Sequence, residues 1–231
     1  MDLGGFFSAE GPFMNVLNKT GELIIVSVLW LLCCLPVVTI GASTTALYYA
    51  VVKTVRKDRG YVYKEFFRSF KRNLKSGTLL TVIFLLLAVV LLYNREYLNA
   101  VTGGNELALA QGVLGQADGM TLLLYVVYDG ILVIMALILV YLFPALSRFD
   151  MKTADIVKLA FVMSIRHIYI TLALGGAFAL VVFLQYRILP LYTLIILPGL
   201  FTFLASFLTE KAMKKYMGEA PEGEDAWYME L

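Results

Sequence analysis

Long runs of apolar residues, separated by shorter polar segments, organise the whole chain. Five of these runs lie at residues 23–46, 77–93, 122–143, 168–185 and 188–208. Each approaches the roughly 20 residues that a helix needs to cross about 30 Å of hydrocarbon. Backbone polar groups inside a bilayer must bond within their own segment, so such runs predict helices. The pattern therefore predicts an all-α polytopic membrane helical bundle with about five transmembrane helices, in which residues 1–215 form a single integral membrane domain.

The composition strengthens this prediction. Hydrophobic residues make up 60% of the chain and charged residues only 16%, whereas soluble domains carry roughly 25% charged residues. A soluble fold of 231 residues could not bury so much apolar surface.

The distribution of Lys and Arg predicts an orientation in the membrane. Residues 53–75 contain nine basic and two acidic side chains, and basic loops are retained in the cytoplasm. If the crossings alternate from there, sixteen of the 19 basic residues lie inside. Only Lys19, Arg95 and Arg187 are then outside. The N-terminus is expected to be external and the C-terminus cytoplasmic.

The basic loop has a helical period of its own over residues 61–76. Tyr63, Phe66, Phe67, Phe70 and Leu74 repeat at a spacing that places them on one face. The other face carries the basic residues Lys64, Arg68, Lys71, Arg72 and Lys75. This pattern predicts a cytoplasmic amphipathic helix, with membrane lipids as its partner and the basic side chains near anionic headgroups. The helix is joined directly to an apolar run, which favours lipid over nucleic acid.

Two further compositional features concern the tail and metal chemistry. Residues 216–231 are acidic and contain Pro221 and Gly223, so they are expected to form a disordered cytoplasmic tail. Cys33 and Cys34 are adjacent within an apolar run, and His167 is the only histidine. These spacings do not suit a metal site, so no metal and no cofactor are predicted.

The most distinctive stretch surrounds Pro36, which removes one helical hydrogen bond and predicts a kink or break in the first apolar run. Thr39, Ser43 and Thr44 follow within three turns. Their hydroxyls have two possible roles: they bind a ligand beside the break, or they bond to backbone carbonyls while small residues allow close helix packing.

Asp129 is the only acidic residue inside the third apolar run. A carboxylate within a membrane is a functional candidate because burying its charge is costly. Arg95 and Arg187 are the basic residues that could reach it. The alternative is that Asp129 lies close to the external surface and has only a structural role.

A second polar group lies on the side that the charge pattern predicts to be cytoplasmic. It comprises Arg148, Asp150, Arg166 and His167, which are candidates for a cytoplasmic interaction. The spacing of Arg148 and Asp150 suggests an ion pair at the end of a helix.

Several of these segments resemble the YesL family of bacterial membrane proteins. The similarity lies in the pattern around Trp30, in residues 35–46 and 66–73, and in Phe143-Pro144 followed by residues 148–150. It extends over roughly residues 6–215. The resemblance implies a small helical protein of the bacterial cell membrane, encoded beside carbohydrate uptake systems and glycan-degrading enzymes. It carries over no catalytic or binding residue.

Two function classes remain. Gly-x-Ser-x-Gly, His-Glu-x-x-His and Walker motifs are absent from the sequence, so a non-enzymatic protein is expected. The first class is an accessory or regulatory component of oligosaccharide uptake, with a sugar ABC transporter permease as its partner. The second is a small transporter or channel, formed as a homo-oligomer, in which Pro36, Thr39, Ser43, Thr44 and Asp129 line a solute path.

Overall fold

Helices account for nearly all of the residues that the computed structural model describes, which are residues 12–101, 119–188 and 190–217. These ranges contain no strand, so the predicted all-α fold is confirmed. Only the first two residues of the predicted tail at 216–231 are described, and the rest of that tail lies outside the described residues.

Seven α-helices make up the described part of the fold. They are α2 (Pro12–Cys33), α3 (Ile40–Ala50), α4 (Val62–Val101), α6 (Gly119–Arg148), α7 (Thr153–Arg166), α8 (Ile168–Arg187) and α9 (Leu197–Met213). Four shorter helical segments connect or extend them: η1 (Val37–Thr39), the π-helix η2 (Val51–Arg56), η3 (Leu191–Ile195) and η4 (Lys214–Tyr216).

Four of the helices are long and apolar enough to cross a membrane. The segments concerned are Phe13–Cys33, Val62–Ala100, Leu123–Arg148 and Ile168–Arg187. The run at 188–208, which predicted a fifth crossing, corresponds to η3 and to α9, a helix of 17 residues.

Pro36 divides the first predicted crossing into two helices. It is extended, with φ −76° and ψ 110°, and it has no N–H group to continue the helix, so the predicted break is confirmed. After this turn α3 runs back along α2, and the Trp30 indole donates a hydrogen bond of 3.2 Å to the Thr44 hydroxyl. The prediction that residues 23–46 form a single crossing is therefore wrong, because they form a helical hairpin.

This hairpin changes the expected position of Lys19. The Lys19 Nζ atom lies 3.2 Å from the Asp58 Oδ2 atom, in the turn between η2 and α4. The charge pattern had placed Lys19 outside and residues 53–75 inside, but two atoms so close cannot lie on opposite sides of about 30 Å of hydrocarbon. Lys19 therefore lies on the same side as the basic loop. The predicted external N-terminus concerns residues 1–11, which lie outside the described residues.

The predicted amphipathic helix at 61–76 is the first part of α4 and not a separate element. This part of α4 packs along α3 and η2 through a buried stripe. The stripe consists of Val62, Phe66, Ser69, Asn73 and Gly77. Phe66, which was predicted to face lipid, is completely buried, whereas Tyr63 and Phe67 remain exposed. One side of the helix thus packs inside the protein, and only the remaining surface is available to lipid.

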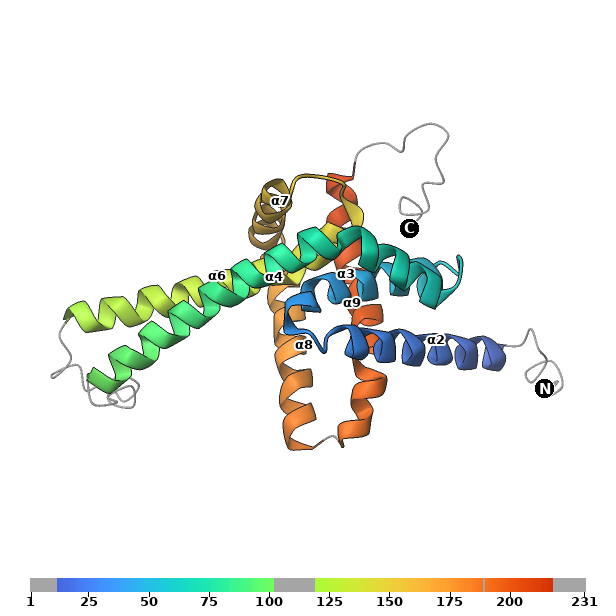
Figure 1. Cartoon of the computed structure of the whole chain (residues 1–231), viewed down its shortest axis with the longest axis horizontal. Coiled ribbons are helices and arrows are strands. Elements are labelled where there is room, and N and C mark those ends of the chain that lie inside the picture. The colour runs from blue at the N-terminus through green and yellow to red at the C-terminus, as the bar shows by residue number, and fades with distance from the viewer. Residues whose placement is uncertain (1–11, 102–118, 189, 218–231) are drawn as a thin grey trace.

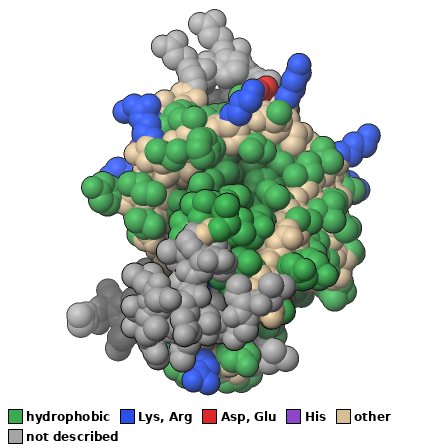
Figure 2. Space-filling model, turned by 90° about the vertical axis from the view of Figure 1, so that its left-hand side faces the viewer, with side chains coloured by type: hydrophobic (Ala, Val, Ile, Leu, Met, Phe, Trp, Pro, Cys, Tyr) green, Lys and Arg blue, Asp and Glu red, His purple; other side chains and the backbone are tan. Residues whose placement is uncertain are grey.

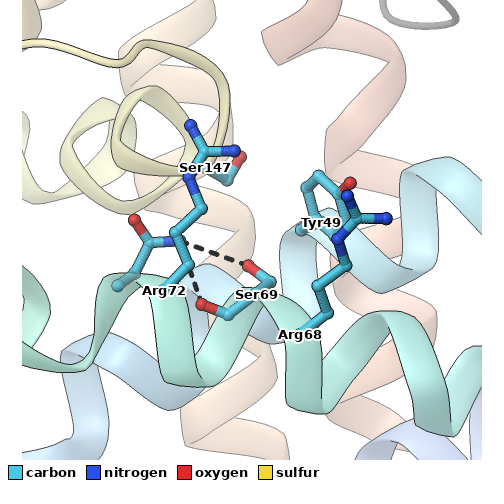
Figure 3. Close-up of a pocket in the computed structure, with 6 residues that line it drawn as sticks. Tyr49, Arg68, Ser69, Arg72 and Ser147 are labelled. Carbon is cyan, nitrogen blue, oxygen red and sulfur yellow. Dashed lines mark hydrogen bonds between the residues drawn. The ribbon is translucent and has the colours of Figure 1, made fainter. Parts of the chain in front are cut away.

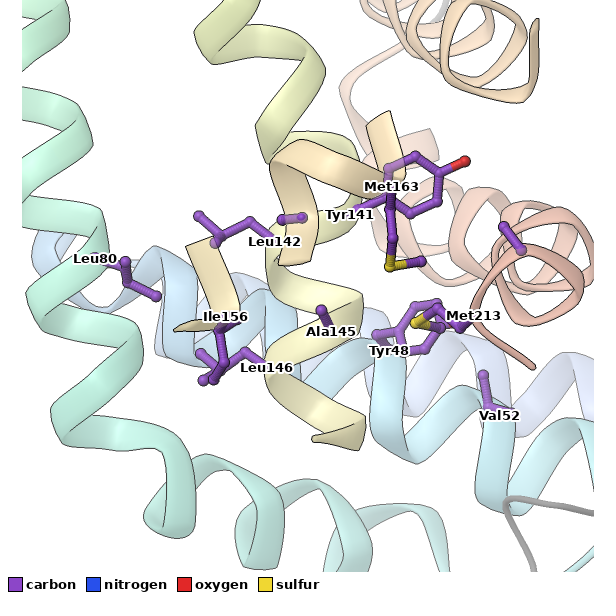
Figure 4. Packing of buried hydrophobic residues seen from close by; sticks show 12 residues of the cluster. Tyr48, Val52, Leu80, Tyr141, Leu142, Ala145, Leu146, Ile156, Met163 and Met213 are labelled. Atoms are coloured by element: carbon purple, nitrogen blue, oxygen red, sulfur yellow. The ribbon is translucent and has the colours of Figure 1, made fainter. Parts of the chain in front are cut away.

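Two buried clusters hold the helices together. The central cluster joins α3, η2, α4, α6, α7 and α9 (Figure 4), and its large members are Tyr48, Leu80, Tyr141, Leu142, Leu146, Ile156, Met163 and Met213. The hairpin cluster joins α2 to α3, η2 and the beginning of α4. It includes Leu23, Val26, Leu47, Val51, Val55 and Phe66. The central cluster brings together segments from both halves of the chain.

Two helical hairpins extend from the central cluster in different directions (Figure 1). One is formed by α4 and α6, and the other by α8 and α9. In the most apolar stretch of α6 only 11% of the residues are buried inside the protein, and the fraction is the same in α8. Figure 2 shows a broad hydrophobic surface with Lys and Arg side chains towards its edges. Exposed apolar surfaces of this extent require an apolar environment, so the fold is compatible with a multi-pass membrane protein.

Candidate functional site

The closest contact between α3 and α4 occurs at two glycines. The Gly41 N–H donates a hydrogen bond of 2.9 Å to the Thr81 hydroxyl. A Cβ atom on Gly77 would lie 2.7 Å from the Ala42 backbone nitrogen, and one on Gly41 would lie 2.7 Å from the Gly77 carbonyl oxygen. Larger residues do not fit at these separations. The small residues after Pro36 therefore allow close helix packing, as one of the two interpretations of this stretch expected.

A buried ion pair lies beside this crossing, at the end of α6. The Arg148 guanidinium donates two hydrogen bonds to Glu210 Oε1, of 2.9 Å from Nε and 2.7 Å from Nη2. Both side chains are only 2% exposed. A charge-assisted contact of this kind holds α6 firmly against α9.

Tyr48 connects the same carboxylate to α3. Its hydroxyl lies 2.8 Å from Glu210 Oε1 and also 2.8 Å from the Thr209 hydroxyl. Burial raises the pKa of Tyr48 well above its ordinary value, and the neighbouring Glu210 carboxylate adds to this shift. The phenol therefore stays protonated and donates to the carboxylate. Three helices meet at one buried charge pair.

Sequence reasoning missed this cluster because its partners are far apart in the chain. The predicted ion pair between Arg148 and Asp150 is wrong: Asp150 lies 3.3 Å from Arg72 on α4, while Arg148 binds Glu210. The only signal for Glu210 was an acidic residue directly after an apolar run.

The other two predicted cytoplasmic residues lie close to Tyr216. The Arg166 guanidinium is 5.8 Å from the centre of the Tyr216 ring, and the His167 ring centre is 6.3 Å from it. Arg148, Asp150, Arg166 and His167 thus take part in three different sets of contacts and do not form one site.

Two of the three hydroxyls around Pro36 bind the backbone of their own hairpin, and the buried Ser43 hydroxyl has no hydrogen-bond partner among the described residues. Thr39 Oγ1 lies 2.6 Å from the Cys33 carbonyl oxygen and 2.7 Å from that of Pro36. The Thr44 hydroxyl donates to the Ile40 carbonyl at 2.8 Å, and Ser43 is completely buried. Two of these hydroxyls therefore satisfy carbonyl groups at and after the helix break.

Asp129 binds Arg95, one of the two partners that the sequence suggested. The Arg95 Nε atom donates to Asp129 Oδ1 at 2.9 Å, and the Asp129 side chain is 52% exposed. Arg95 lies fourteen residues along α4 from Thr81, which contacts Gly41, and this separation corresponds to about 20 Å of helix. Asp129 and the residues around Pro36 therefore occupy different regions of the fold.

A polar pocket lies between α3, α4 and α6, beside the basic face of α4. Lys64, Arg68, Lys71, Arg72 and Lys75 are all exposed, as predicted for the basic face. Two of these five line the pocket, which is a small hollow open to the surface (Figure 3). Its lining residues are Tyr49, Arg68, Ser69, Arg72, Asn73 and Ser147. The neutral members of this set were not candidates from the sequence.

Metal chemistry has no support in the part of the chain that the structure describes. No group of three or more His, Cys, Asp or Glu side chains is arranged there to hold a metal ion.

The comparisons with known proteins concern the first half of the chain. No curated protein and no solved structure matches this chain. Residues 23–95 match the family model described as "Protein of unknown function, DUF624". The matching segment contains the second half of α2, all of α3, the Gly41–Gly77 crossing and every pocket residue except Ser147. This part of the chain is therefore similar to an uncharacterised protein family.

Proposed function

We propose that this protein is a non-enzymatic accessory component of a bacterial carbohydrate uptake system, and that it binds a permease subunit in the plasma membrane. The resemblance to the YesL family supports this proposal, since members of that family are encoded beside such systems. The match of residues 23–95 to a family of unknown function agrees with that resemblance.

The observation that carries the proposal is the exposed apolar surface of the α4–α6 hairpin. Leu86 and Val90 on α4 are 60% and 54% exposed, and Val126 on α6 is 62% exposed. The hairpin extends beyond the central cluster (Figure 1), so its outer half is free to contact helices of another protein. Helices associate in a bilayer by close packing of such surfaces.

The alternative function, a solute path formed by this chain, has less support. That path required Asp129 to act together with Pro36, Thr39, Ser43 and Thr44. Asp129 is paired with Arg95, and Thr39 and Thr44 bind backbone carbonyls. These contacts favour structural roles for the residues concerned.

Site-specific photocrosslinking in native membranes tests the accessory function. A photoreactive phenylalanine analogue would replace Val90 or Val126 on the hairpin, and Leu180 on α8 is the matched control because it is also apolar and 57% exposed. We expect the hairpin positions, but not Leu180, to crosslink to a permease subunit identified by mass spectrometry.

A flux assay in proteoliposomes tests the alternative function, transport by this chain alone. If the purified protein alone moves an oligosaccharide across proteoliposome membranes, and Asp129→Asn abolishes that movement, then the chain is a transporter and the accessory function is wrong.

A further inference from the structure

The pocket between α3, α4 and α6 is lined by two arginines and by neutral polar side chains. We propose that it binds the headgroup phosphate of an anionic phospholipid. This proposal does not depend on a permease partner, and it is more specific than a general attraction between the basic face and the membrane.

The charge of the lining residues indicates an anion. Two of the six lining side chains are guanidinium groups and none is acidic. In Figure 3, Arg68 and Arg72 both rise from α4, with Arg68 towards Tyr49 and Arg72 towards Ser147. One planar guanidinium group can donate two parallel hydrogen bonds to two phosphate oxygens, which makes arginine well suited to this role.

Both arginines are available to a ligand. Arg72 pairs with Asp150 at 3.3 Å, but the Asp150 side chain is 93% exposed. An exposed ion pair of this kind is weak, so a phosphate can displace it. Within the described residues, Arg68 makes no ion pair.

The floor of the pocket is polar and buried. Ser69, Asn73 and Ser147 are 3%, 9% and 9% exposed. The Asn73 amide donates to the Ser69 carbonyl at 3.1 Å and to the Ser69 hydroxyl at 3.3 Å, and Ser147 donates to the Pro144 carbonyl at 2.7 Å. The floor therefore presents neutral polar atoms and no carboxylate to an anion that the two guanidinium groups bind.

The position of the pocket favours a lipid as the source of the phosphate. Arg72 lies seven residues before Leu79, where the long apolar part of α4 begins, and this separation is about 10 Å along a helix. Headgroups occupy a layer of similar depth outside the hydrocarbon core. A soluble phosphate would not need a site so close to the apolar part of α4.

Lipid titration of the full-length protein in a non-ionic detergent tests the proposal. Native mass spectrometry would measure binding of dioleoylphosphatidylglycerol, and of dioleoylglycerol, which lacks the phosphate. Inorganic phosphate would be added as a competitor. The variants are Arg68→Gln and Arg72→Gln. The matched control is Lys75→Gln, which removes the same charge from the same helix but does not line the pocket.

We expect each arginine variant to weaken phosphatidylglycerol binding about tenfold or more, as the loss of one charge-assisted pair predicts. Lys75→Gln should change it less than about threefold, since it alters only the general surface potential. Dioleoylglycerol should bind far more weakly than phosphatidylglycerol. Unchanged circular dichroism and melting temperature would show that the variants remain folded.

Three results would decide against the proposal or part of it. Equal losses in the Lys75 and arginine variants would show diffuse attraction and overturn the pocket. Equal binding of dioleoylglycerol and phosphatidylglycerol would show that the phosphate is not recognised. If inorganic phosphate competes at concentrations similar to the lipid, the phosphate site is supported but its assignment to lipid is overturned.

Discussion

The ion pair between Arg148 and Glu210 allows a quantitative test of how the helices are held together. The perturbation is removal of either partner, by Glu210→Leu or Arg148→Met, and of both together. The guanidinium makes two hydrogen bonds to Glu210 Oε1, and Tyr48 makes a third contact to the same oxygen. All of these groups are buried, so water cannot replace a lost partner.

The expected magnitudes follow from the 2% exposure of both charged side chains. Loss of one partner leaves the other charge buried without a counter-charge, which lowers the unfolding free energy by about 3–5 kcal/mol. Replacement of both partners by apolar side chains removes the two charges together. The double variant should therefore be within about 1 kcal/mol of the wild type, or more stable.

Equilibrium unfolding in mixed micelles measures these differences. Increasing the fraction of sodium dodecyl sulfate unfolds the protein, and the fluorescence of Trp30, which packs against the hairpin cluster, follows the transition. The control is the exposed pair of Arg95 and Asp129, whose side chains are 30% and 52% exposed. The corresponding double-mutant cycle there should give a coupling below about 1 kcal/mol.

Two outcomes would refute this reasoning. If either single variant loses less than about 1 kcal/mol, water reaches the pair and it is not buried in solution. If the double variant loses the sum of the two single losses, then Arg148 and Glu210 do not interact, and the contact between α6 and α9 has another basis.

Three further predictions concern the glycine crossing, the hairpin topology and the exposed ion pair. Gly77→Ala should destabilise the protein by about 1–3 kcal/mol in the same unfolding assay, because its Cβ would meet the backbone of α3. Gly130→Ala, which has nothing within 4 Å, should be neutral or stabilising by up to about 1 kcal/mol. Cysteines replacing Lys19 and Asp58, in a chain without native cysteines, should react with a membrane-impermeant maleimide from the same side, and labelling from opposite sides would contradict the hairpin. Asp129→Asn should lower the unfolding free energy by less than about 1 kcal/mol, and a larger loss would show that this carboxylate is essential to the fold.

Local patterns in the sequence predicted the elements that depend on local physics. Apolar runs without Lys or Arg located α6 and α8, since the length needed to cross hydrocarbon leaves few alternatives. The break at Pro36 followed from its missing N–H group. The contact between Arg95 and Asp129 could be anticipated because few charges lie in that part of the chain.

The contacts that position the candidate site could not be predicted in the same way. A proline between two apolar segments predicts a break, but it does not tell whether the chain continues or turns back, and α3 turns back. Arg148 lies two residues from Asp150 and 62 residues from Glu210. Sequence spacing therefore favoured the wrong partner, because tertiary packing determines which carboxylate is buried beside the guanidinium.

The buried ion pair and the phosphate pocket share two helices, α3 and α6, on which they use adjacent residues. On α3, Tyr48 binds Glu210 and Tyr49 lines the pocket. On α6, Arg148 binds Glu210 and Ser147 lines the pocket. A shift of either helix would therefore alter both sites at once. A lipid that binds only the folded pocket should raise the unfolding free energy as its concentration exceeds the dissociation constant. Loss of Glu210 should in turn weaken lipid binding, although this carboxylate does not line the pocket.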